Sequence, residues 1–315
     1  MRAIECTIRS ILPGSSCPWF TRPMSQLAEL ASRIARHAVT DSRPQWIEGI
    51  LVFSAKQVTA PMGSVTEPMF TLVVRGAKRT ILGDHVFEHG AGKAAVVTVE
   101  LPLIGQIVEA PFLALGIRLE PATIAQLMVD GGPTTIRPHE GPGMAVSDAD
   151  EKLLDAIVRL MRLLDDPRDL RVLGPAVRRE IHWWLLNGPQ GPMIRQAGIA
   201  DSRLALVARA IAWIRTRYDR VIRIDDLASD IGTSVSSLNR HFRAVTAMSP
   251  LQYQKQIRLQ KARLHLIAAP HDVAAIGYSV GYDNPSQFSR EYRRMYGAPP
   301  GQDAIRLQTM AIVQE

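Results

Sequence analysis

The chain lacks the features of a secreted, membrane-anchored or disulfide-rich protein. No apolar run among its 315 residues approaches the roughly 18 to 20 residues that a bilayer-spanning helix needs. No apolar stretch of signal-peptide length precedes Pro13. Cysteine is limited to Cys6 and Cys17, both outside any periodic segment. We therefore expect a cytoplasmic protein without a membrane partner. Two such thiols are usually inert in a reducing compartment, and a redox switch is the weaker alternative.

Motifs of common enzyme classes are also missing. The sequence has no Gly-rich phosphate loop, no Gly-x-Ser-x-Gly elbow and no zinc-type cysteine pairs. One cluster, from His85 to His89, has the spacing of a helical zinc motif. It follows a Gly-Asp turn within β-type sequence, however, and in a strand Glu88 would point away from both histidines. We therefore expect no catalytic residue, no metal and no cofactor, and the chain is predicted not to be an enzyme.

Positive charge is concentrated in the last third of the chain. The whole sequence has 37 Lys and Arg against 30 Asp and Glu, a formal net charge of +7. From Asp201 onward there are 16 basic and 10 acidic residues, so this part carries +6 of that charge. A basic segment beside a nearly neutral one favours a polyanion as its partner.

The first half of the chain divides into a tail and a β-rich domain. Residues 1–42 are expected to form an irregular tail, up to about residue 23, and then a short helix with Leu27, Leu30 and Ile34 on one face. Residues 43–140 have short β-type runs separated by turns, a pattern typical of a barrel or sandwich. The six candidate strands are 50–53, 70–74, 79–82, 94–99, 104–108 and 112–119, with a break at 100–102.

Helical patterns dominate the remainder. Residues 145–190 are predicted to form a helical connector, in which Ser147 is the expected N-cap of one helix and residues 175–186 form another. The Gly- and Pro-rich stretch 188–198 is the best candidate interdomain boundary. A C-terminal all-α domain is expected at 201–307. The predicted fold class is thus α+β, with an N-terminal β-barrel, a helical connector and an all-α domain.

A helix-turn-helix pattern begins at Ile224. Leu227 and Ala228 face inward on a short helix, Gly232 turns the chain, and Ser234 is the expected N-cap of the next helix. That second helix buries an apolar face and exposes residue types that suit base edges or phosphates. The exposed residues are Ser236, Asn239, Arg240 and Arg243. Taken alone, this pattern would fit two core helices with a polar outer face equally well.

The same design recurs about 50 residues later. Gly281 is the turn, Asn284 the expected N-cap, and Pro285 the first helical residue, where its missing N–H costs nothing. This helix exposes Ser286, Ser289 and Arg290, followed by two further arginines. A single helix lies between the two units, so the distance between their second helices is fixed. Such a pair can read successive major-groove segments about one helical turn apart.

At these residues the sequence resembles the AraC/XylS family of bacterial transcription regulators, over roughly residues 204–307. The residues that carry the resemblance are Leu227-Ala228, Gly232, Ser234, Leu238, Arg240, Phe242, Pro250, Tyr253, Arg258-Leu259, Ala262, Leu266, Val280-Gly281-Tyr282, Phe288, Ser289-Arg290, Gly297 and Pro299-Pro300. The resemblance implies DNA contacts at Ser236, Asn239, Arg240, Ser286, Ser289 and Arg290. Two departures are Gly277, where alanine is usual and glycine should cost about 1 kcal/mol, and the 303–306 segment, which lacks the usual aromatic-Arg ending.

The N-terminal half resembles the branch of this family with a cupin-like β-barrel before a helical connector. The resemblance rests on Glu67-Pro68, residues 75–79, Leu82-Gly83-Asp84, Leu101-Pro102, Gly105-Gln106 and residues 110–114. It implies a regulatory domain that binds a small effector, mediates dimerisation, or both. The resemblance names no ligand-binding residues, because which residues face the inside of the barrel depends on the strand registers.

The sequence therefore predicts a sequence-specific DNA-binding transcription regulator. Its expected partners are double-stranded promoter DNA, RNA polymerase if it is an activator, an unknown small-molecule effector and a second copy in a homodimer. One alternative is a cupin-type metal enzyme with an accessory DNA-binding domain. That reading requires a paired His-x-His with a later Glu and His, and this set is not found. A further alternative is a regulator whose barrel binds no ligand and acts only as a dimer scaffold.

Overall fold

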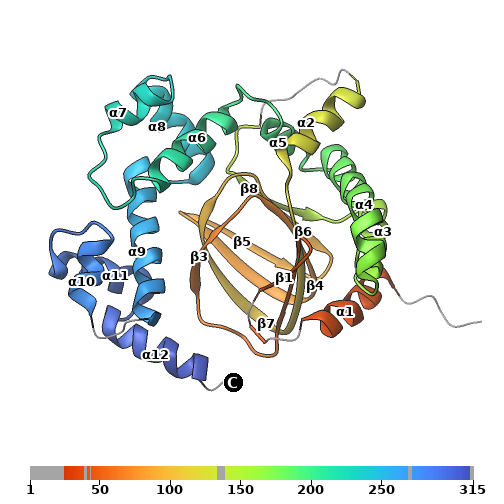
Figure 1. Cartoon of the computed structure of the whole chain (residues 1–315), viewed down its shortest axis with the longest axis horizontal. Coiled ribbons are helices and arrows are strands. Elements are labelled where there is room, and N and C mark those ends of the chain that lie inside the picture. The colour runs from red at the N-terminus through yellow and green to blue at the C-terminus, as the bar shows by residue number, and fades with distance from the viewer. Residues whose placement is uncertain (1–24, 39–40, 43, 133–138, 269–271, 313–315) are drawn as a thin grey trace, which may run out of the picture.

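The computed structural model describes residues 25–38, 41–42, 44–132, 139–268 and 272–312. Cys6, Cys17 and the irregular segment predicted at 1–23 lie outside these residues. The architecture is α+β as predicted, with helices arranged around a central antiparallel sheet (Figure 1). Among the described helices, none is long and apolar enough to cross a membrane.

Within the described ranges, eight antiparallel strands form one sheet in the order β1-β2-β7-β4-β6-β8, with β3 paired to β7 and β5 paired to β4. The strands are β1 (Gln45–Ile47), β2 (Ile50–Ala55), β3 (Met62–Thr66), β4 (Met69–Leu82), β5 (His85–Gly90), β6 (Lys93–Val97), β7 (Leu101–Arg118) and β8 (Met144–Asp148). Strands β3 and β5 lie beside the ends of the two central strands, β3 along the beginning of β7 and β5 along the end of β4 (Figure 1).

The two central strands are longer than the sequence predicts. Residues 70–74 and 79–82 belong to the single strand β4. The predicted strands 104–108 and 112–119 both fall on β7, which begins inside the predicted break at 100–102 and ends at Arg118. The sequence-based prediction was wrong here because register shifts between Val73 and Lys78 let β4 bend without ending. The bend requires a glycine at position 76, which has φ +74° and where a Cβ would lie 2.5 Å from the carbonyl oxygen of Glu109.

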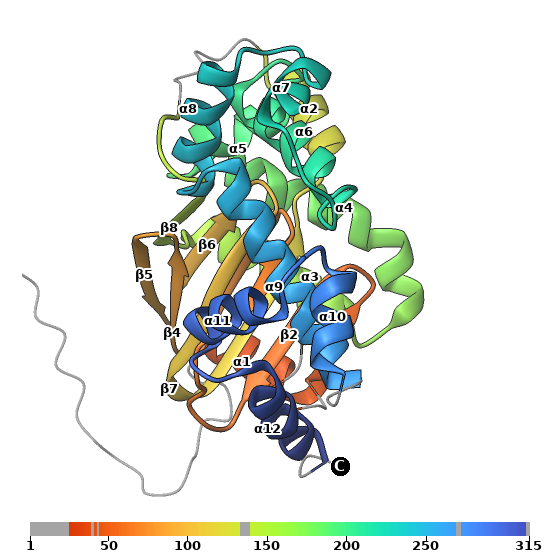
Figure 2. The ribbon, with the colours of Figure 1, turned by 90° about the vertical axis from the view of Figure 1, so that its left-hand side faces the viewer.

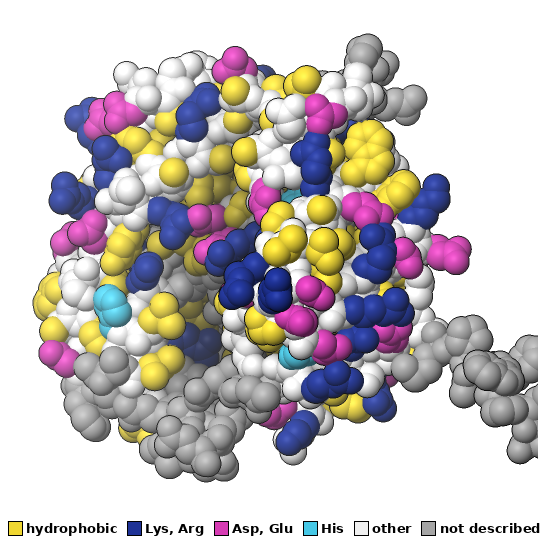
Figure 3. Space-filling view, turned by 45° about the vertical axis from the view of Figure 1, so that its right-hand side comes forward, with side chains coloured by type: hydrophobic (Ala, Val, Ile, Leu, Met, Phe, Trp, Pro, Cys, Tyr) yellow, Lys and Arg dark blue, Asp and Glu magenta, His cyan; other side chains and the backbone are white. Residues whose placement is uncertain are grey.

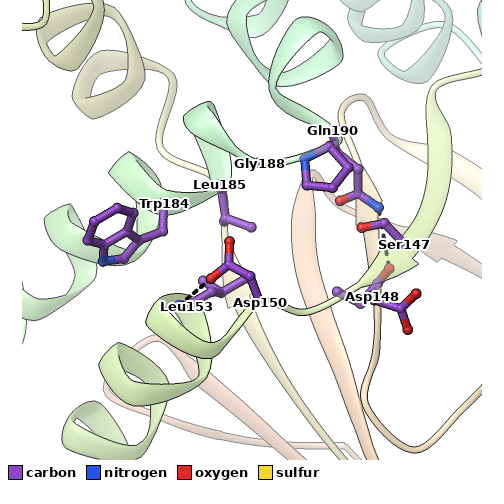
Figure 4. A pocket seen from close by; sticks show the side chains of 10 residues that line it. Ser147, Asp148, Asp150, Leu153, Trp184, Leu185, Gly188 and Gln190 are labelled. Atoms are coloured by element: carbon purple, nitrogen blue, oxygen red, sulfur yellow. Dashed lines mark hydrogen bonds between the residues drawn. The ribbon is translucent and has the colours of Figure 1, made fainter. Parts of the chain in front are cut away.

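One face of the sheet is covered by three helices, α1 (Gln26–His37), α3 (Glu151–Leu163) and α4 (Pro167–Asn187) (Figure 1). Ile34 of α1 and Ile157 of α3 are fully buried with Leu72 of β4. The predicted N-cap at Ser147 was wrong, because Ser147 pairs with Ala94 in the sheet. The side chain of Asp150 caps α3 instead, accepting from the backbone N–H of Leu153 at 2.8 Å (Figure 4).

The predicted connector helix 175–186 begins earlier, at Pro167, and has Pro175 inside it. Two short helices, α2 (Pro121–Asp130) and α5 (Gly191–Ala197), complete this part of the molecule. The Gly- and Pro-rich stretch 188–198 is not extended linker, since it forms α5 and buries Met193 and Ile194 in the first core. The division of the chain into domains at 42, 140, 190 and 201 remains a prediction.

Seven helices make up the described C-terminal part: α6 (Arg203–Arg215), α7 (Ile224–Asp230), α8 (Val235–Thr246), α9 (Pro250–Ala268), α10 (Val273–Ser279), α11 (Pro285–Tyr296) and α12 (Pro300–Ile312). Helix α9 runs across the sheet, with α7 and α8 near one end and α10 and α11 near the other (Figure 2). A second core joins this part to the sheet, because Leu82, Val97 and Leu103 pack in one cluster with Phe242 and Val245.

Candidate nucleic-acid interface

The first helix-turn-helix unit is formed by α7 and α8. Its turn contains Gly232 at φ +75°, a conformation that favours glycine. Ser234 is the N-cap of α8, as predicted, and its side chain accepts a hydrogen bond from the backbone N–H of Ser237 at 3.2 Å. Leu238 and Phe242 are fully buried. The opposite face of α8 is therefore fixed toward solvent.

Helices α10 and α11 form the second unit with matching chemistry. Asn284 is the predicted N-cap, and its side chain accepts from the backbone N–H of Ser286 at 2.8 Å and of Gln287 at 3.2 Å. Pro285 occupies the first turn of α11, also as predicted. Both second helices end in a left-handed residue, Ala247 at φ +59° and Gly297 at φ +79°. The two units thus share their beginnings and their ends.

Six of the seven residues predicted to contact DNA are exposed, and Ser289 is partly buried. The exposed residues are Ser236, Asn239, Arg240, Arg243, Ser286 and Arg290. Their side chains are not committed within the described part of the chain, since none of the hydrogen bonds, ion pairs or ring contacts found there involves them. An arginine or asparagine without an internal partner is free to bind a base edge.

The second helices of the two units, α8 and α11, are called the recognition helices below. Both are attached to the sheet domain by their C-terminal turns. In α8 the carbonyl oxygen of Val245 accepts from the backbone N–H of Gly143 at 2.7 Å. In α11 the ring of Tyr296 packs on β3, where a Cβ at Gly63 would lie 3.4 Å from its Cε1 atom. The N-terminal halves, which carry most of the predicted contact residues, are left free. Helix-turn-helix proteins contact bases with this half of the recognition helix.

The charge on α8 comes from its arginines and not from His241. Burial lowers the pKa of His241 below its ordinary value, and the nearby charges of Arg240 and Arg203 lower it further. A neutral His241 leaves Arg240 and Arg243 as the cations of this helix. Helix α11 adds Arg290 in its N-terminal half and Arg293 and Arg294 in its last turns.

The side chain of Arg258, near the middle of α9, bonds to the backbone of the loop that precedes the first unit and to the turn of the second. It donates to the carbonyl oxygens of Tyr218 at 2.6 Å, Arg220 at 2.8 Å and Gly281 at 2.6 Å. Gln254, one helical turn earlier, donates to the same two carbonyls of the 218–220 loop. Sequence reasoning noted Arg258 only as part of the family pattern, because a half-buried arginine on a long polar helix looks like a solvated residue.

The two departures from the family pattern have physical partners in the structure. A Cβ at Gly277 would lie 3.0 Å from the ring of Phe288, so this ring occupies the space that an alanine methyl group would need. In the 303–306 segment, Asp303 is completely buried and accepts from Nε of Arg263 at 2.9 Å and from the hydroxyl of Tyr292 at 2.9 Å. Arg306 also donates to Asp303 at 2.8 Å. A buried ion pair therefore joins α12 to α9 behind the second unit.

The metal-like cluster lies on β5, as the β-type reading of that segment predicted. Glu88 pairs with Arg79 of β4 at 2.6 Å, whereas the neighbouring His89 is buried. Among the described residues, no group of three or more His, Cys, Asp and Glu side chains is arranged to hold a metal ion. Sequence reasoning missed Lys78, directly opposite His89 on β4. Its position on the inner face depends on the strand register, which the sequence does not reveal.

A small pocket lies where α3 and α4 meet β6 and β8 (Figure 4). Ser147, Asp150, Trp184 and Gln190 are among its lining residues. The Gln190 amide is already committed, since it donates to the carbonyl oxygens of Ala94 and Ala145. The free space is about that of one water molecule, which is too little for an organic effector.

Comparison with known proteins gives matches over both halves of the chain. The profile described as the AraC-type transcriptional regulator N-terminus matches residues 46–193, and a helix-turn-helix domain profile matches residues 227–304. An AraC-like transcription regulator of Streptomyces lividans is 33% identical over 33% of this chain and 34% of its own length. The transcriptional activator RhaS of Salmonella schwarzengrund is 24% identical over 49% of this chain and 57% of its own length.

These matches span about a third to just over half of the length of the curated relatives. Among solved structures, one match is ToxT of Vibrio cholerae with a bound unsaturated fatty acid. The alignment covers 84% of this chain and 96% of the ToxT chain, with a TM-score of 0.54 and 10% identity. That likeness shows the fold: a sheet domain followed by a helical C-terminal part in one chain.

Proposed function

This chain belongs to the AraC/XylS family of transcription regulators, and we propose that it is itself a sequence-specific DNA-binding regulator. The observation that carries the proposal is the pair of recognition helices α8 and α11. Both have capped N-termini and exposed polar residues in the N-terminal half, and both are docked at the other end. This arrangement can present two sets of side chains to two successive turns of the major groove.

Each predicted contact residue has a role in this proposal. Arg240 and Arg290 bind guanine through two parallel hydrogen bonds, and Asn239 binds adenine in the same manner. Ser236, Ser289 and Ser286 bind a base or a phosphate, and Arg243 binds phosphate. Contacts from Lys and Arg to phosphate provide most of the affinity, which therefore falls steeply with salt.

We propose that the N-terminal sheet domain, at residues 43–140, binds a small effector that controls DNA binding. Two features support this proposal. The matching profile is that of the regulatory half of this family, and a relative of the same fold, ToxT, was solved with an unsaturated fatty acid bound. The core shared between the sheet and α8 would let a change in the sheet reach a recognition helix directly.

The proposal includes three further partners or locations. The protein works in the cytoplasm, where promoter DNA is found, and contacts RNA polymerase if it is an activator. It forms a homodimer through the helical segment 145–190. On α4, Val172 and Leu173 are 72% and 49% exposed, and the face turned forward in Figure 3 has hydrophobic side chains interspersed with Lys and Arg. Light scattering of the wild type and of Leu173→Glu measures the dimer.

No catalytic step is part of the proposal. The rival reading is a metal enzyme with an accessory DNA-binding domain. Elemental analysis of the purified protein separates the two readings, because the rival requires about one bound metal ion per chain and turnover that depends on it.

The proposed function is tested by fluorescence anisotropy on the DNA upstream of the protein's own gene, with scrambled DNA as competitor over a series of salt concentrations. A specific regulator gives tight binding that resists competitor and weakens steeply with salt. Binding that scrambled competitor removes completely on every fragment of a genomic selection would contradict it.

A further inference from the structure

The β4–β5 hairpin has cations on both of its faces, and only one of them has a counter-charge. Arg79 points to the outer face and pairs with Glu88 across the hairpin at 2.6 Å. The preceding residue, Lys78, points to the inner face, where it lies opposite His89 on β5 and Ile107 on β7. Within the described residues, the Lys78 ammonium has no hydrogen-bond or ion-pair partner.

The Lys78 side chain lies along the inside of the sheet. Its Cε and Nζ atoms would be 2.9 Å and 3.3 Å from a Cβ added at Gly105 of β7. Glycine at this position therefore provides the space in which the ammonium lies. Burial lowers the pKa of Lys78, and no carboxylate is close enough to oppose that shift. A recessed cation of this kind is costly unless an anion joins it.

His89, beside Lys78, has one ring nitrogen without a partner. Its side chain is only 5% exposed, and its Nδ1 atom has no hydrogen-bond partner within the described residues. Burial, followed by the charge of Lys78, lowers its pKa to about 4. A backbone hydrogen bond with Phe87 opposes only part of this shift. The imidazole is therefore neutral near pH 7, and in the tautomer with its proton on Nδ1 it can donate one hydrogen bond to a ligand oxygen.

One side of this pair is apolar. Ile107, directly across from Lys78, belongs to a buried cluster with Val73, Phe112 and Ala55. Phe53 packs edge-on against Phe112 in the same cluster, with ring centroids 5.8 Å apart. One cation and one neutral donor in an apolar wall match a ligand with one anionic group and an apolar body. An inorganic anion would leave the apolar wall without a partner.

We propose that Lys78 and His89 bind the carboxylate of a small apolar organic acid on the inner face of the sheet. This proposal rests on the proposed function and names the chemical class of its effector. The site is also near the DNA-binding part. Leu82, four residues further along β4, lies in the core shared with α8, and a Cβ at Gly83 would lie 2.8 Å from that of Ala247. A ligand that moves β4 would therefore move the C-terminal end of α8.

Isothermal titration calorimetry on the full-length protein tests the site. The probes are straight-chain carboxylates from butanoate to decanoate, the primary alcohols of the same lengths, and sulfate. The expected result is saturable binding of at least one carboxylate, with the matching alcohol and sulfate about tenfold weaker or worse. Absence of saturable binding for every carboxylate at millimolar concentration overturns the proposal. So does sulfate binding as strong as that of the best carboxylate.

Two variants locate the binding. Lys78→Met removes the ammonium and keeps the length of the side chain, and it should weaken carboxylate binding by about tenfold or more. Arg79→Met removes the neighbouring cation on the outer face and should leave the affinity within about twofold, because that guanidinium already has Glu88. Equal carboxylate affinity of Lys78→Met and the wild type overturns the proposal.

A thermal melt without ligand keeps the test independent of folding defects. Lys78→Met should melt at the same temperature as the wild type or higher, because it removes an unpaired recessed charge, and it should lose the rise in melting temperature that the carboxylate gives the wild type. A rise as large as that of the wild type overturns the proposal. DNA binding is measured on the same samples. Carboxylate binding without promoter binding would contradict the proposed function alone, and the reverse would contradict this site alone.

Discussion

Arg258 donates from Nη1 to the carbonyl oxygen of Gly281 at 2.6 Å and so joins the linker helix α9 to the turn of the second helix-turn-helix unit. The same guanidinium donates to two carbonyls of the loop that precedes the first unit. Gly281 has φ +92°, and a side chain there would collide with the carbonyl oxygen of Asp219. One side chain and one glycine thereby hold the loop before the first unit against the turn of the second unit.

Exchanging Arg258 for lysine is expected to disturb both stability and DNA recognition. Lysine keeps the charge but cannot reach three carbonyl oxygens with a planar fork. The loss of charge-assisted hydrogen bonds should lower the free energy of unfolding by about 2 kcal/mol or more. Affinity for a site with both half-sites should fall more than affinity for one half-site. The mirror exchange Lys261→Arg, at an exposed position on the same helix, should change neither, and equal losses on both DNAs would argue against a positioning role.

Arg240→Ala and Arg290→Ala should each weaken specific DNA binding and leave the thermal melt unchanged. Loss of a bidentate base contact costs about 1 to 3 kcal/mol, or about 5- to 150-fold in affinity. Neither guanidinium has a partner within the described residues, so stability should not suffer. Arg171→Ala on α4, also exposed, removes the same charge far from the recognition helices and is the control. Wild-type affinity in both variants would be incompatible with the assigned roles.

Asp303→Asn is expected to destabilise the second helix-turn-helix unit. The carboxylate is completely buried between Arg263, Tyr292 and Arg306. Neutralising it leaves the Arg263 guanidinium, itself only 10% exposed, without its counter-charge. The expected cost is about 3 kcal/mol, measured by urea unfolding. Asp283→Asn, at an exposed position on the preceding turn, should cost little, and equal midpoints for the two variants would contradict the role of Asp303.

His89 should make stability fall as the pH drops below about 6.5. The unfolded chain protonates this histidine near its ordinary pKa of 6.5, whereas the folded protein resists protonation down to about pH 4. His89 therefore does not affect the free energy of unfolding above pH 6.5. The free energy of unfolding falls as the pH drops from 6.5 toward 4, because only the unfolded chain takes up the proton there. The fall amounts to about 3 kcal/mol. His89→Gln should flatten the melting temperature over this window relative to the wild type.

Two comparisons separate His89 from other titrating groups. His85→Gln alters an exposed histidine on the same strand and should retain the pH dependence of the wild type. Glu29 also loses a stabilising contribution in acid, because its hydrogen bonds to Arg162 and Arg33 hold its pKa at about 2, but that loss begins only below pH 4.5. Identical slopes for His89→Gln and the wild type between pH 6.5 and 4 would rule out this assignment.

The C-terminal half could be predicted well because its signals are local. Ser234, Asn284 and Pro285 act within one helical turn of themselves, and the alternation of buried residues such as Phe242 and Tyr292 follows the helical period. The assignment of Ser147 as a cap failed because pairing with Ala94, more than 50 residues away, competes with the local preference.

The functional features of the sheet depend on contacts that no local pattern encodes. Because of register shifts within β4, Lys78 reaches the inner face, opposite His89 and with its ammonium beside Gly105. The role of Arg258 depends on three carbonyl oxygens from two separate loops. Likewise, the core shared by Leu82 and Phe242 unites residues 160 positions apart. Sequence patterns identify the helices, but only the assembled chain places these groups together.

The most direct test of two separate recognition helices is hydroxyl-radical footprinting of the wild type, Arg240→Ala and Arg290→Ala on the same bound promoter fragment. The wild type should protect two segments about 10 base pairs apart on one face of the duplex. Arg240→Ala should lose protection of one segment and Arg290→Ala protection of the other. If both variants lose the same segment, or if the wild type protects a single segment, two recognition helices do not read the DNA in the way that this structure predicts.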